Sequence, residues 1–147
     1  MASSKSKKSK GGKTAPSSGI FSFEDGSTYK GEFIVDNGIK MREGQGTYTS
    51  SSGESYTGGW IRDLQEGEGV YRFSSGSVYE GSFFKGGFHG TGKYTFPDGA
   101  CYEGEWNMSK MHGKGSYKDA KQVVYTGNFY NGLYDNGVSY VVVREKK

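Results

Sequence analysis

Histidine is the side chain best suited to acid–base or metal chemistry near neutral pH, and the chain has two, His89 and His112. Each stands immediately before a Gly-x-Gly motif. The same repeat position is occupied by Glu43, Glu66 and Asp135 in the other repeats. A zinc site needs three or four ligands that converge on one point, whereas residues one hairpin apart lie about 10 Å apart. We therefore expect no metal and interpret this position as a solvated polar one at a loop edge.

Other chemical patterns are equally weak. The segment Gly87–Tyr94 resembles a phosphate-binding loop, but Tyr94 stands where a metal-binding Ser or Thr is required and a strand follows instead of a helix. The single cysteine, Cys101, fits a small strand position and a reducing compartment. No pair of carboxylates suggests acid–base work. The sequence thus predicts a non-enzymatic protein without a cofactor.

The aromatic residues carry the stronger pattern, because they recur at a fixed spacing. A Tyr-x-Gly-x-Trp/Phe motif begins at Tyr29, Tyr56, Tyr79, Tyr102 and Tyr125, and the last four lie 23 residues apart. A Gly-x-Gly-x-Tyr motif keeps the same spacing and begins at Gly44, Gly67, Gly90 and Gly113. A fixed period of this length indicates a repeat protein, which usually offers a binding surface.

Each repeat is predicted to be a β-hairpin. Strict alternation puts Tyr79, Gly81 and Phe83 on one face of a strand, and Asp-Gly or Ser-Gly pairs supply the turns that join the repeats. A ring from a neighbouring strand can lie over a strand glycine. With one aromatic and one polar face, the repeats predict a single curved sheet whose aromatic face forms a groove. Four extra residues in the segment 34–43 predict a longer first loop, and the last repeat lacks its glycines.

The composition separates a tail from the repeats. The 147 residues suit one domain, with 26 glycines, two prolines and 16% aromatic residues. We expect residues 1–18 to be a disordered Lys/Ser/Gly-rich tail and residues 19–147 to form the repeat domain. The tail holds Lys5, Lys7, Lys8, Lys10 and Lys13. Without them, 14 basic residues face 16 acidic ones, so the net charge of +3 belongs to the tail.

These motifs resemble the MORN repeat, and the resemblance covers residues 19 to about 140. It implies an all-β, single-layer, elongated and twisted antiparallel sheet of about five successive hairpins, degenerate at the C-terminal end. The family's members are mostly scaffolds, several of them axonemal or cortical, and the family has been tied to phospholipid binding. The resemblance implies a cytoplasmic protein of the cytoskeleton, in the axoneme of a cilium or flagellum, within a multiprotein complex.

The leading hypothesis is a scaffold that binds a helix or extended segment of a partner protein along the aromatic groove, although the rings could instead serve only to cover the glycines. The predicted contact residues are Tyr56, Trp60, Tyr71, Tyr79, Phe83, Tyr94, Tyr102, Trp106 and Tyr117. Glu80, Glu103 and Glu105 are predicted to pair with basic partner residues at the groove's rim. The same glutamates argue against nucleic-acid binding.

Two further associations follow from charge and strand propensity. The five lysines could bind anionic phospholipid or the acidic tails of tubulin, each lysine contributing about 1 kcal/mol near an anionic membrane; a peripheral membrane adaptor is thus the alternative function. The run Val138–Val143 is rich in β-branched residues, so it predicts an exposed edge strand that pairs end to end with a second copy or a partner. The charged residues that follow, Arg144, Glu145, Lys146 and Lys147, are predicted to act as gatekeepers.

Overall fold

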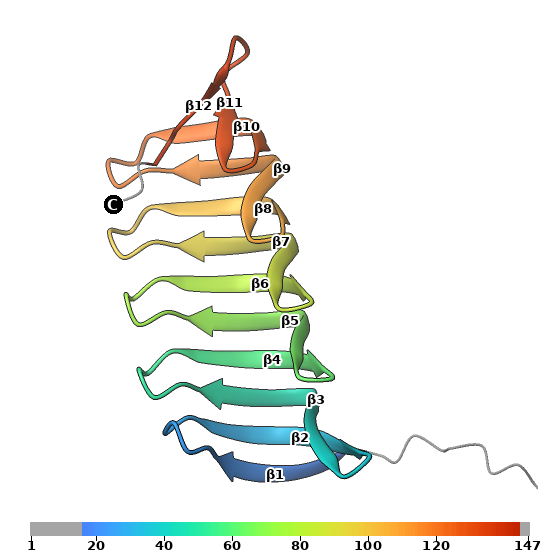
Figure 1. The fold of residues 1–147 in the computed structure, drawn as a ribbon. Helices are drawn as coiled ribbons and strands as arrows, with labels where there is room; N and C mark the ends of the chain where they lie inside the picture. The colour runs from blue at the N-terminus through green and yellow to red at the C-terminus, as the bar shows by residue number, and fades with distance from the viewer. Residues whose placement is uncertain (1–15, 145–147) are drawn as a thin grey trace, which may run out of the picture.

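The computed structural model describes residues 16–144, which form one open antiparallel sheet (Figure 1). Its strands are β1 (Ser17–Ser22), β2 (Thr28–Asp36), β3 (Ile39–Thr49), β4 (Ser55–Ile61), β5 (Leu64–Arg72), β6 (Val78–Phe84), β7 (Gly87–Thr95), β8 (Cys101–Asn107), β9 (Lys110–Lys118), β10 (Val124–Tyr130), β11 (Leu133–Asp135) and β12 (Tyr140–Val141). Strand order follows chain order throughout. No helix occurs among the described residues, and the predicted fold class is confirmed. The repeat domain begins at Ser17, two residues before the expected boundary.

Two kinds of turn alternate along the sheet. The outer turns contain the predicted Asp-Gly and Ser-Gly pairs, and each is closed by a backbone hydrogen bond such as Phe96 N–H to the Ala100 carbonyl at 2.8 Å. The inner turns have two residues, both with positive φ, as in Arg62 (45°) and Asp63 (69°). This is the backbone of a type I′ turn, which matches the twist of a hairpin.

The two ends of the sheet differ from the sequence-based expectation. The extra residues of the first repeat lengthen β2 and β3 around the turn at Asn37 and Gly38, so the predicted long loop is wrong. At the other end, only Tyr140 and Val141 form an edge strand, because Asn136 accepts the N–H groups of Val138 and Ser139 at 2.9 Å and reverses the chain. The predicted edge strand from Val138 to Val143 is therefore too long.

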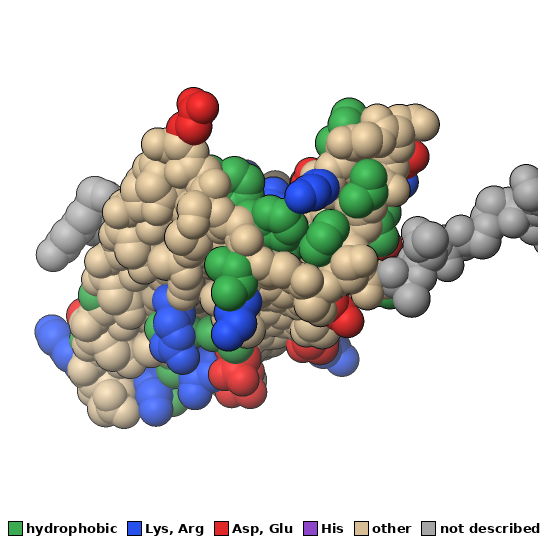
Figure 2. Space-filling model, turned by 90° about the horizontal axis from the view of Figure 1, so that it is seen from below, with side chains coloured by type: hydrophobic (Ala, Val, Ile, Leu, Met, Phe, Trp, Pro, Cys, Tyr) green, Lys and Arg blue, Asp and Glu red, His purple; other side chains and the backbone are tan. Residues whose placement is uncertain are grey.

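A bulge bends each hairpin at the first glycine of the Gly-x-Gly motif. Gly90 has φ of 81°, in the left-handed region, and the pairing of β6 with β7 shifts register between Gly81 and Phe83. Bulges bend a strand and increase its twist. Seen along the sheet from the β1 end, the molecule is hollowed between two raised parts, with hydrophobic side chains in the hollow (Figure 2).

The second glycine of each motif lies beneath a tyrosine ring. A Cβ at Gly92 would come closer than 3.0 Å to the Tyr79 ring, and Gly115 has the same relation to Tyr102. The prediction that rings cover strand glycines is confirmed. The buried core consists mainly of members of this tyrosine column and of the Trp/Phe column that follows it, together with Tyr117 and Ala100, so a sheet without a second layer obtains a core from its own rings.

Candidate functional site

The aromatic side chains form two layers with different exposure. The inner layer is buried and consists of Tyr29, Tyr56, Trp60, Tyr79, Phe83, Tyr102, Trp106, Tyr117 and Phe129. A half-buried outer layer packs on it and faces the hollow; we call this outer layer the aromatic trough, formed by Phe21, Tyr48, Tyr71, Phe73, Phe88, Tyr94, Phe96, Met111, Tyr125 and Tyr134. Phe88 stacks on Tyr79, with ring centroids 3.9 Å apart and an interplanar angle of 9°.

The inner layer is held by hydrogen bonds as well as by packing. The Tyr56 hydroxyl donates to the Gly59 carbonyl at 2.9 Å, which satisfies a backbone oxygen at the bulge. The indole N–H of Trp60 donates to the Gly46 carbonyl at 3.0 Å, in the preceding hairpin. Burial is the main cause that raises the pKa of Tyr56 to about 12. These groups are committed to structure, since a buried polar atom without its partner is costly.

Most of the predicted contact rings are buried and not open to a partner. Seven of the nine rings lie in the inner layer, because neighbouring hairpins overlap; Tyr79, for example, packs edge-on against Trp106 at 5.4 Å. Only Tyr71 and Tyr94 belong to the aromatic trough. A polypeptide in the hollow would therefore meet the outer layer, from which the sequence predicted only Tyr71 and Tyr94 as contact residues.

The three predicted rim glutamates do not line the hollow. Glu80 and Glu103 alternate with the buried rings and stand opposite Lys93 in neighbouring strands, on the outer face of the sheet. The Glu105 carboxylate accepts the backbone N–H of Lys114 at the next bulge. Glu32 occupies the same repeat position and accepts the Gln45 N–H at 2.6 Å. Both glutamates therefore stabilise the bulge of their own hairpin.

Carboxylates of the turns supply the acidic rim instead. Glu54 accepts the Tyr71 hydroxyl at 2.8 Å, and this bond is the main cause that lowers the pKa of Glu54. Asp98 accepts the Ala100 N–H at 3.0 Å, which together with Arg144 lowers its pKa. Asp63 pairs with Arg42 at 3.0 Å. Of these three carboxylates, Asp63 and Asp98 are paired with arginines, and Glu54 forms no ion pair with a described residue.

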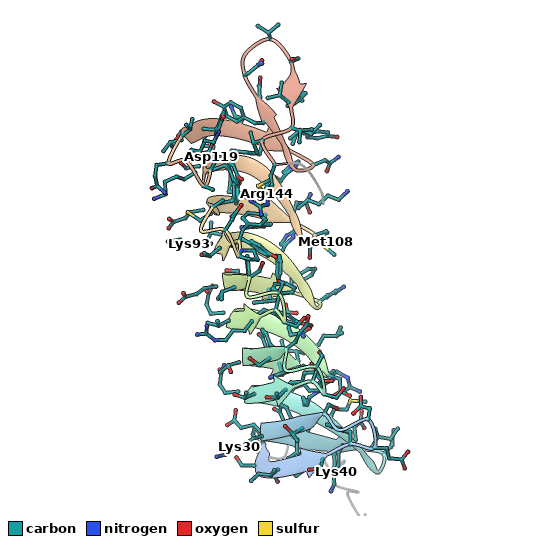
Figure 3. The ribbon with its side chains drawn as sticks, turned by 90° about the vertical axis from the view of Figure 1, so that its left-hand side faces the viewer. Lys30, Lys40, Lys93, Met108, Asp119 and Arg144 are labelled. Carbon is teal, nitrogen blue, oxygen red and sulfur yellow. The ribbon has the colours of Figure 1, made fainter. Side chains whose placement is uncertain are left out.

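Cations lie over the aromatic rings at both ends of the trough. The Arg42 guanidinium lies 4.3 Å from the Trp60 ring centroid, and Lys40 lies 5.1 Å from that of Phe21. At the other end, the Arg144 guanidinium lies 3.8 Å from the Phe96 centroid. In Figure 3, Lys40 lies near the β1 end of the sheet, and Arg144 lies in its upper half, below the last strands. Aromatic ring faces therefore contact cationic side chains of the chain itself in two places, and such a contact is stronger where water is excluded.

The end of the chain occupies one part of the trough. After β12 the chain runs back toward the outer turns (Figure 1), and Val143 packs against the core. Arg144 donates to Asp98 at 3.0 Å and to the Tyr117 hydroxyl at 3.4 Å. We call residues 142–144 the C-terminal arm. Arg144 therefore lies in the trough, and its predicted role as a gatekeeper at the sheet edge is wrong.

The other end of the trough contains a cavity of about 330 Å³ between β1, β2 and β3. Its lining includes Phe21, Phe23, Asp25, Tyr48 and Lys40. This cavity, called the N-terminal pocket below, combines exposed rings with charged groups. Sequence analysis did not assign Phe23 or Asp25 a role in binding, although both belong to the predicted turn of the first repeat.

The histidine position ties one hairpin to the next. Glu66 accepts the Lys85 N–H at 3.0 Å, and in the next repeat Nδ1 of His89 accepts the Met108 N–H at 3.4 Å. Nδ1 of His112 is buried without a partner among the described residues. These side chains are half-buried rather than fully solvated as expected. Within residues 16–144, no group of three or more His, Cys, Asp or Glu is arranged to hold a metal.

Several sequence-based expectations concern residues that the structure does not describe. The lysines Lys5, Lys7, Lys8, Lys10 and Lys13 and the predicted gatekeepers Glu145, Lys146 and Lys147 all lie outside residues 16–144. Cys101 lies in β8, in agreement with the predicted strand position, and is a half-buried free thiol. In the described part of the chain, no helix is long and apolar enough to cross a membrane.

The geometry defines the chain as a β-hairpin repeat protein whose rings form both its core and its open surface. The family model for the MORN repeat matches residues 40–55, 56–78, 79–101 and 102–122, more than half of the chain. The protein belongs to this family of non-catalytic repeats, whose members are consistent with scaffold or adaptor roles in binding proteins or membranes. No curated protein matches the chain closely enough to be counted as a relative.

Proposed function

We propose that the protein is a non-enzymatic adaptor that holds an extended segment of a partner protein in the aromatic trough. One observation carries this proposal: the C-terminal arm lies in the trough, with Val143 on the core and Arg144 over Phe96. The arm belongs to neither a helix nor a strand and bends at Val143 and Arg144, which favours a non-helical ligand over the helix that the sequence left as an alternative. Binding by successive side chains on a preformed surface limits the ordering cost on the protein's side.

The trough supplies the two features that such a segment needs. Half-buried rings such as Tyr71, Phe73 and Tyr94 give flat apolar contact area, and aromatic side chains are enriched where binding energy concentrates. The Glu54 carboxylate, which forms no ion pair with a described residue, gives a directional acceptor at the rim. Asp63 and Asp98 already pair with Arg42 and Arg144. The proposed ligand therefore alternates aliphatic with basic side chains.

A peptide-display selection against the full-length protein tests this function. Peptides that bind the wild type should bind the Phe73→Ala variant about tenfold more weakly or worse, because a ring of the trough is lost. Val70→Ala is the matched control, since Val70 precedes Tyr71 in β5 and faces the opposite side. Selected peptides that bind both variants alike, or no selection of any peptide, would contradict the proposal. Circular dichroism checks that both variants keep their β structure.

We further propose that the adaptor serves a ciliary or flagellar assembly. The basis is a resemblance of residues 66–132 to the short MORN repeat-containing protein 2, a form associated with cilia and sperm flagella. A tagged full-length protein expressed in ciliated cells should remain with the axoneme after detergent removes the membranes. Uniform release into the detergent fraction would argue against this location.

The alternative function, a peripheral membrane adaptor, rests on the five lysines within residues 1–18. Attraction to anionic lipid falls with salt, because the Debye length is about 8 Å at physiological ionic strength. Vesicles containing phosphatidylserine should then bind the full chain but not a chain lacking residues 1–18, and binding should weaken as salt rises. The same pair of proteins tests binding to acidic tubulin tails. Salt-insensitive binding would exclude this electrostatic mechanism.

A further inference from the structure

Arg144 shows how the trough binds a guanidinium group. Its planar head lies 3.8 Å from the Phe96 ring centroid, donates to Oδ2 of Asp98 at 3.0 Å and approaches the Tyr117 hydroxyl at 3.4 Å. A ring face, a carboxylate and a hydroxyl thus surround one arginine. Stacking combined with directional hydrogen bonds suits the flat guanidinium better than the compact ammonium of lysine.

The same three residue types recur in the first repeat. Phe23 and Asp25 occupy the positions of Phe96 and Asp98 in an outer turn, and both turns are closed by the same backbone bonds. Tyr48 stands opposite Tyr29 in the sheet as Tyr117 stands opposite Tyr102. The two intervening turns lack the acid, because they have serine in its place. The chain therefore builds this constellation twice, at the turn between β1 and β2 and at the turn between β7 and β8.

At the first repeat the constellation is open. Oδ1 of Asp25 accepts the N–H and hydroxyl of Ser27, at 2.9 and 2.5 Å, just as Oδ1 of Asp98 accepts the Ala100 N–H. Among the described residues, Oδ2 of Asp25 and the Tyr48 hydroxyl make no hydrogen bond, and the Phe23 ring is 47% exposed. All three residues line the N-terminal pocket. Its counterpart is covered, since Tyr117 beneath Arg144 is only 2% exposed.

We propose that the N-terminal pocket binds an arginine side chain carried on an extended segment of a partner protein. The guanidinium would stack on Phe23 and donate to Oδ2 of Asp25 and to the Tyr48 hydroxyl. This site deepens the proposed function and rests on it, because it names the anchor residue of the polypeptide that the trough would hold.

The pocket's own charges leave Asp25 as the acid available to that arginine. Arg42 pairs with Asp63 at 3.0 Å, so these two charges offset each other. Its guanidinium lies over the Trp60 ring at 4.3 Å and over one face of the Tyr48 ring at 5.4 Å, which leaves the Tyr48 hydroxyl as the group available to a ligand. Lys40 lies over Phe21 and Phe33, and no ion pair joins it to a described carboxylate. Lys40 disfavours a second cation nearby, so specificity depends on the direct contacts at Asp25 rather than on net charge.

A partner protein fits this pocket better than the C-terminal arm of a second copy. The arm is tethered next to its own Asp98 site, and a tethered ligand has an effective concentration in the millimolar range for a short link. Exchange between copies would have to break those contacts first. The chain thus satisfies one constellation internally and leaves the other for a different arginine.

The probe is an amidated peptide with the sequence of residues 139–144, Ser-Tyr-Val-Val-Val-Arg. The control peptide is identical except that citrulline replaces arginine. Citrulline keeps the shape but loses the charge. The arginine peptide should bind the full-length protein about tenfold more tightly than the citrulline peptide, the ratio expected for a charge-assisted hydrogen bond. Equal affinities, or no measurable binding of the arginine peptide, would overturn the proposal.

Matched variants locate the binding site. Asp25→Asn and Tyr48→Phe should each weaken the arginine peptide, because they remove the charge or the hydroxyl while the asparagine oxygen still accepts the Ser27 N–H. Asp98→Asn and Tyr117→Phe make the same changes at the occupied site and should not weaken it. If Asp98→Asn and Tyr117→Phe weakened the arginine peptide while Asp25→Asn and Tyr48→Phe did not, the assignment of binding to the N-terminal pocket would be overturned. Circular dichroism confirms that each variant folds.

Two outcomes distinguish the arginine pocket for a partner protein from self-association and from the broader adaptor function. Light scattering that shows Asp25-dependent dimers or chains would mean that a second copy is the occupant, and would overturn the assignment to a partner protein. Displayed peptides that bind through Phe73 but contain no arginine would overturn the arginine pocket and leave the proposed adaptor function standing. Failure of the adaptor function itself would appear as an absence of any selected peptide.

Discussion

The two glycines of each Gly-x-Gly motif have different physical duties. Gly90 has φ of 81° at a bulge, a conformation that costs a residue with a side chain about 1–2 kcal/mol. Gly92 is needed for space, because a Cβ there would meet the Tyr79 ring closer than 3.0 Å. Strand alternation places Gly90 and Gly92 on the same face, so sequence analysis explained both by ring cover. A bulge cannot be recognised from alternation alone.

Substitutions at this pair should separate the two duties. Gly92→Ala is expected to destabilise the protein by about 1–3 kcal/mol, as overpacking against a buried ring does. Gly90→Asn should cost less than about 1 kcal/mol, because asparagine tolerates the left-handed region. Denaturant unfolding followed by circular dichroism measures both. A larger loss at Gly90 than at Gly92 would contradict this division.

The buried tyrosines should also limit stability at high pH. Burial raises the pKa of Tyr56 and of Tyr102 to about 12, above the ordinary value of 10.0. Between these pH values the unfolded chain loses protons that the folded chain keeps, so stability is full below pH 10 and falls as pH rises through the folded pKa. Unfolding should therefore accompany tyrosinate absorbance. The exposed Tyr130 gives the control, since Tyr130→Phe should leave this transition unchanged.

At the scale of elements, the inner turns are the part that sequence reasoning missed. Lys85–Gly86 and Asn131–Gly132 carry the glycine that marks a type I′ turn, but Arg62–Asp63 and Met108–Ser109 do not. The non-glycine residues are held by bonds to the previous repeat. Ser109 accepts the Phe88 N–H through its hydroxyl at 3.2 Å and donates its own N–H to the Phe88 carbonyl at 2.8 Å.

Relieving the backbone at one such turn should stabilise the protein. Met108 has φ of 45° and is 56% exposed, so Met108→Asn removes strain without removing packing. The expected gain is up to about 1 kcal/mol. The reverse change, Asn131→Met, stands at the equivalent turn with φ of 48° and should cost a similar amount. Thermal unfolding measures both, and a loss of stability on Met108→Asn would refute the strain argument.

Hairpins, ring cover and repeat boundaries were predictable because each depends on residues within one period. The exposure of a ring was not, because it depends on how neighbouring hairpins overlap: Tyr29 is covered by Trp60 at 5.6 Å, a contact between repeats. The role of His89 depends on the same overlap, because its Nδ1 accepts the Met108 N–H of the next hairpin. The N-terminal pocket could not be predicted from the sequence, because its resemblance to an arginine site is visible only from the contacts of Arg144 in the folded C-terminal arm.

For the whole molecule, stability should be local, because each strand pairs with its chain neighbours only. A chain that ends at Lys118 loses β10, β11 and β12 but keeps every pairing from β1 to β9. We expect it to remain folded, with unchanged hydrogen-exchange protection in β3–β6 and reduced protection in β9, its new edge. Loss of protection throughout the sheet would show that the repeats fold only as one unit.

The C-terminal arm gives the last test at this scale, because it covers the trough without joining the sheet. Its ion pair with Asp98 is partly exposed, and such pairs contribute only about 0–1 kcal/mol to stability. Arg144→Gln should therefore leave the global unfolding free energy nearly unchanged while it speeds hydrogen exchange in residues 142–144. Arg144→Lys should give an intermediate rate, since an ammonium keeps the charge but cannot stack as a plane. Two results would contradict a releasable cover: destabilisation of β7–β9 by Arg144→Gln, or exchange rates in the arm that do not change.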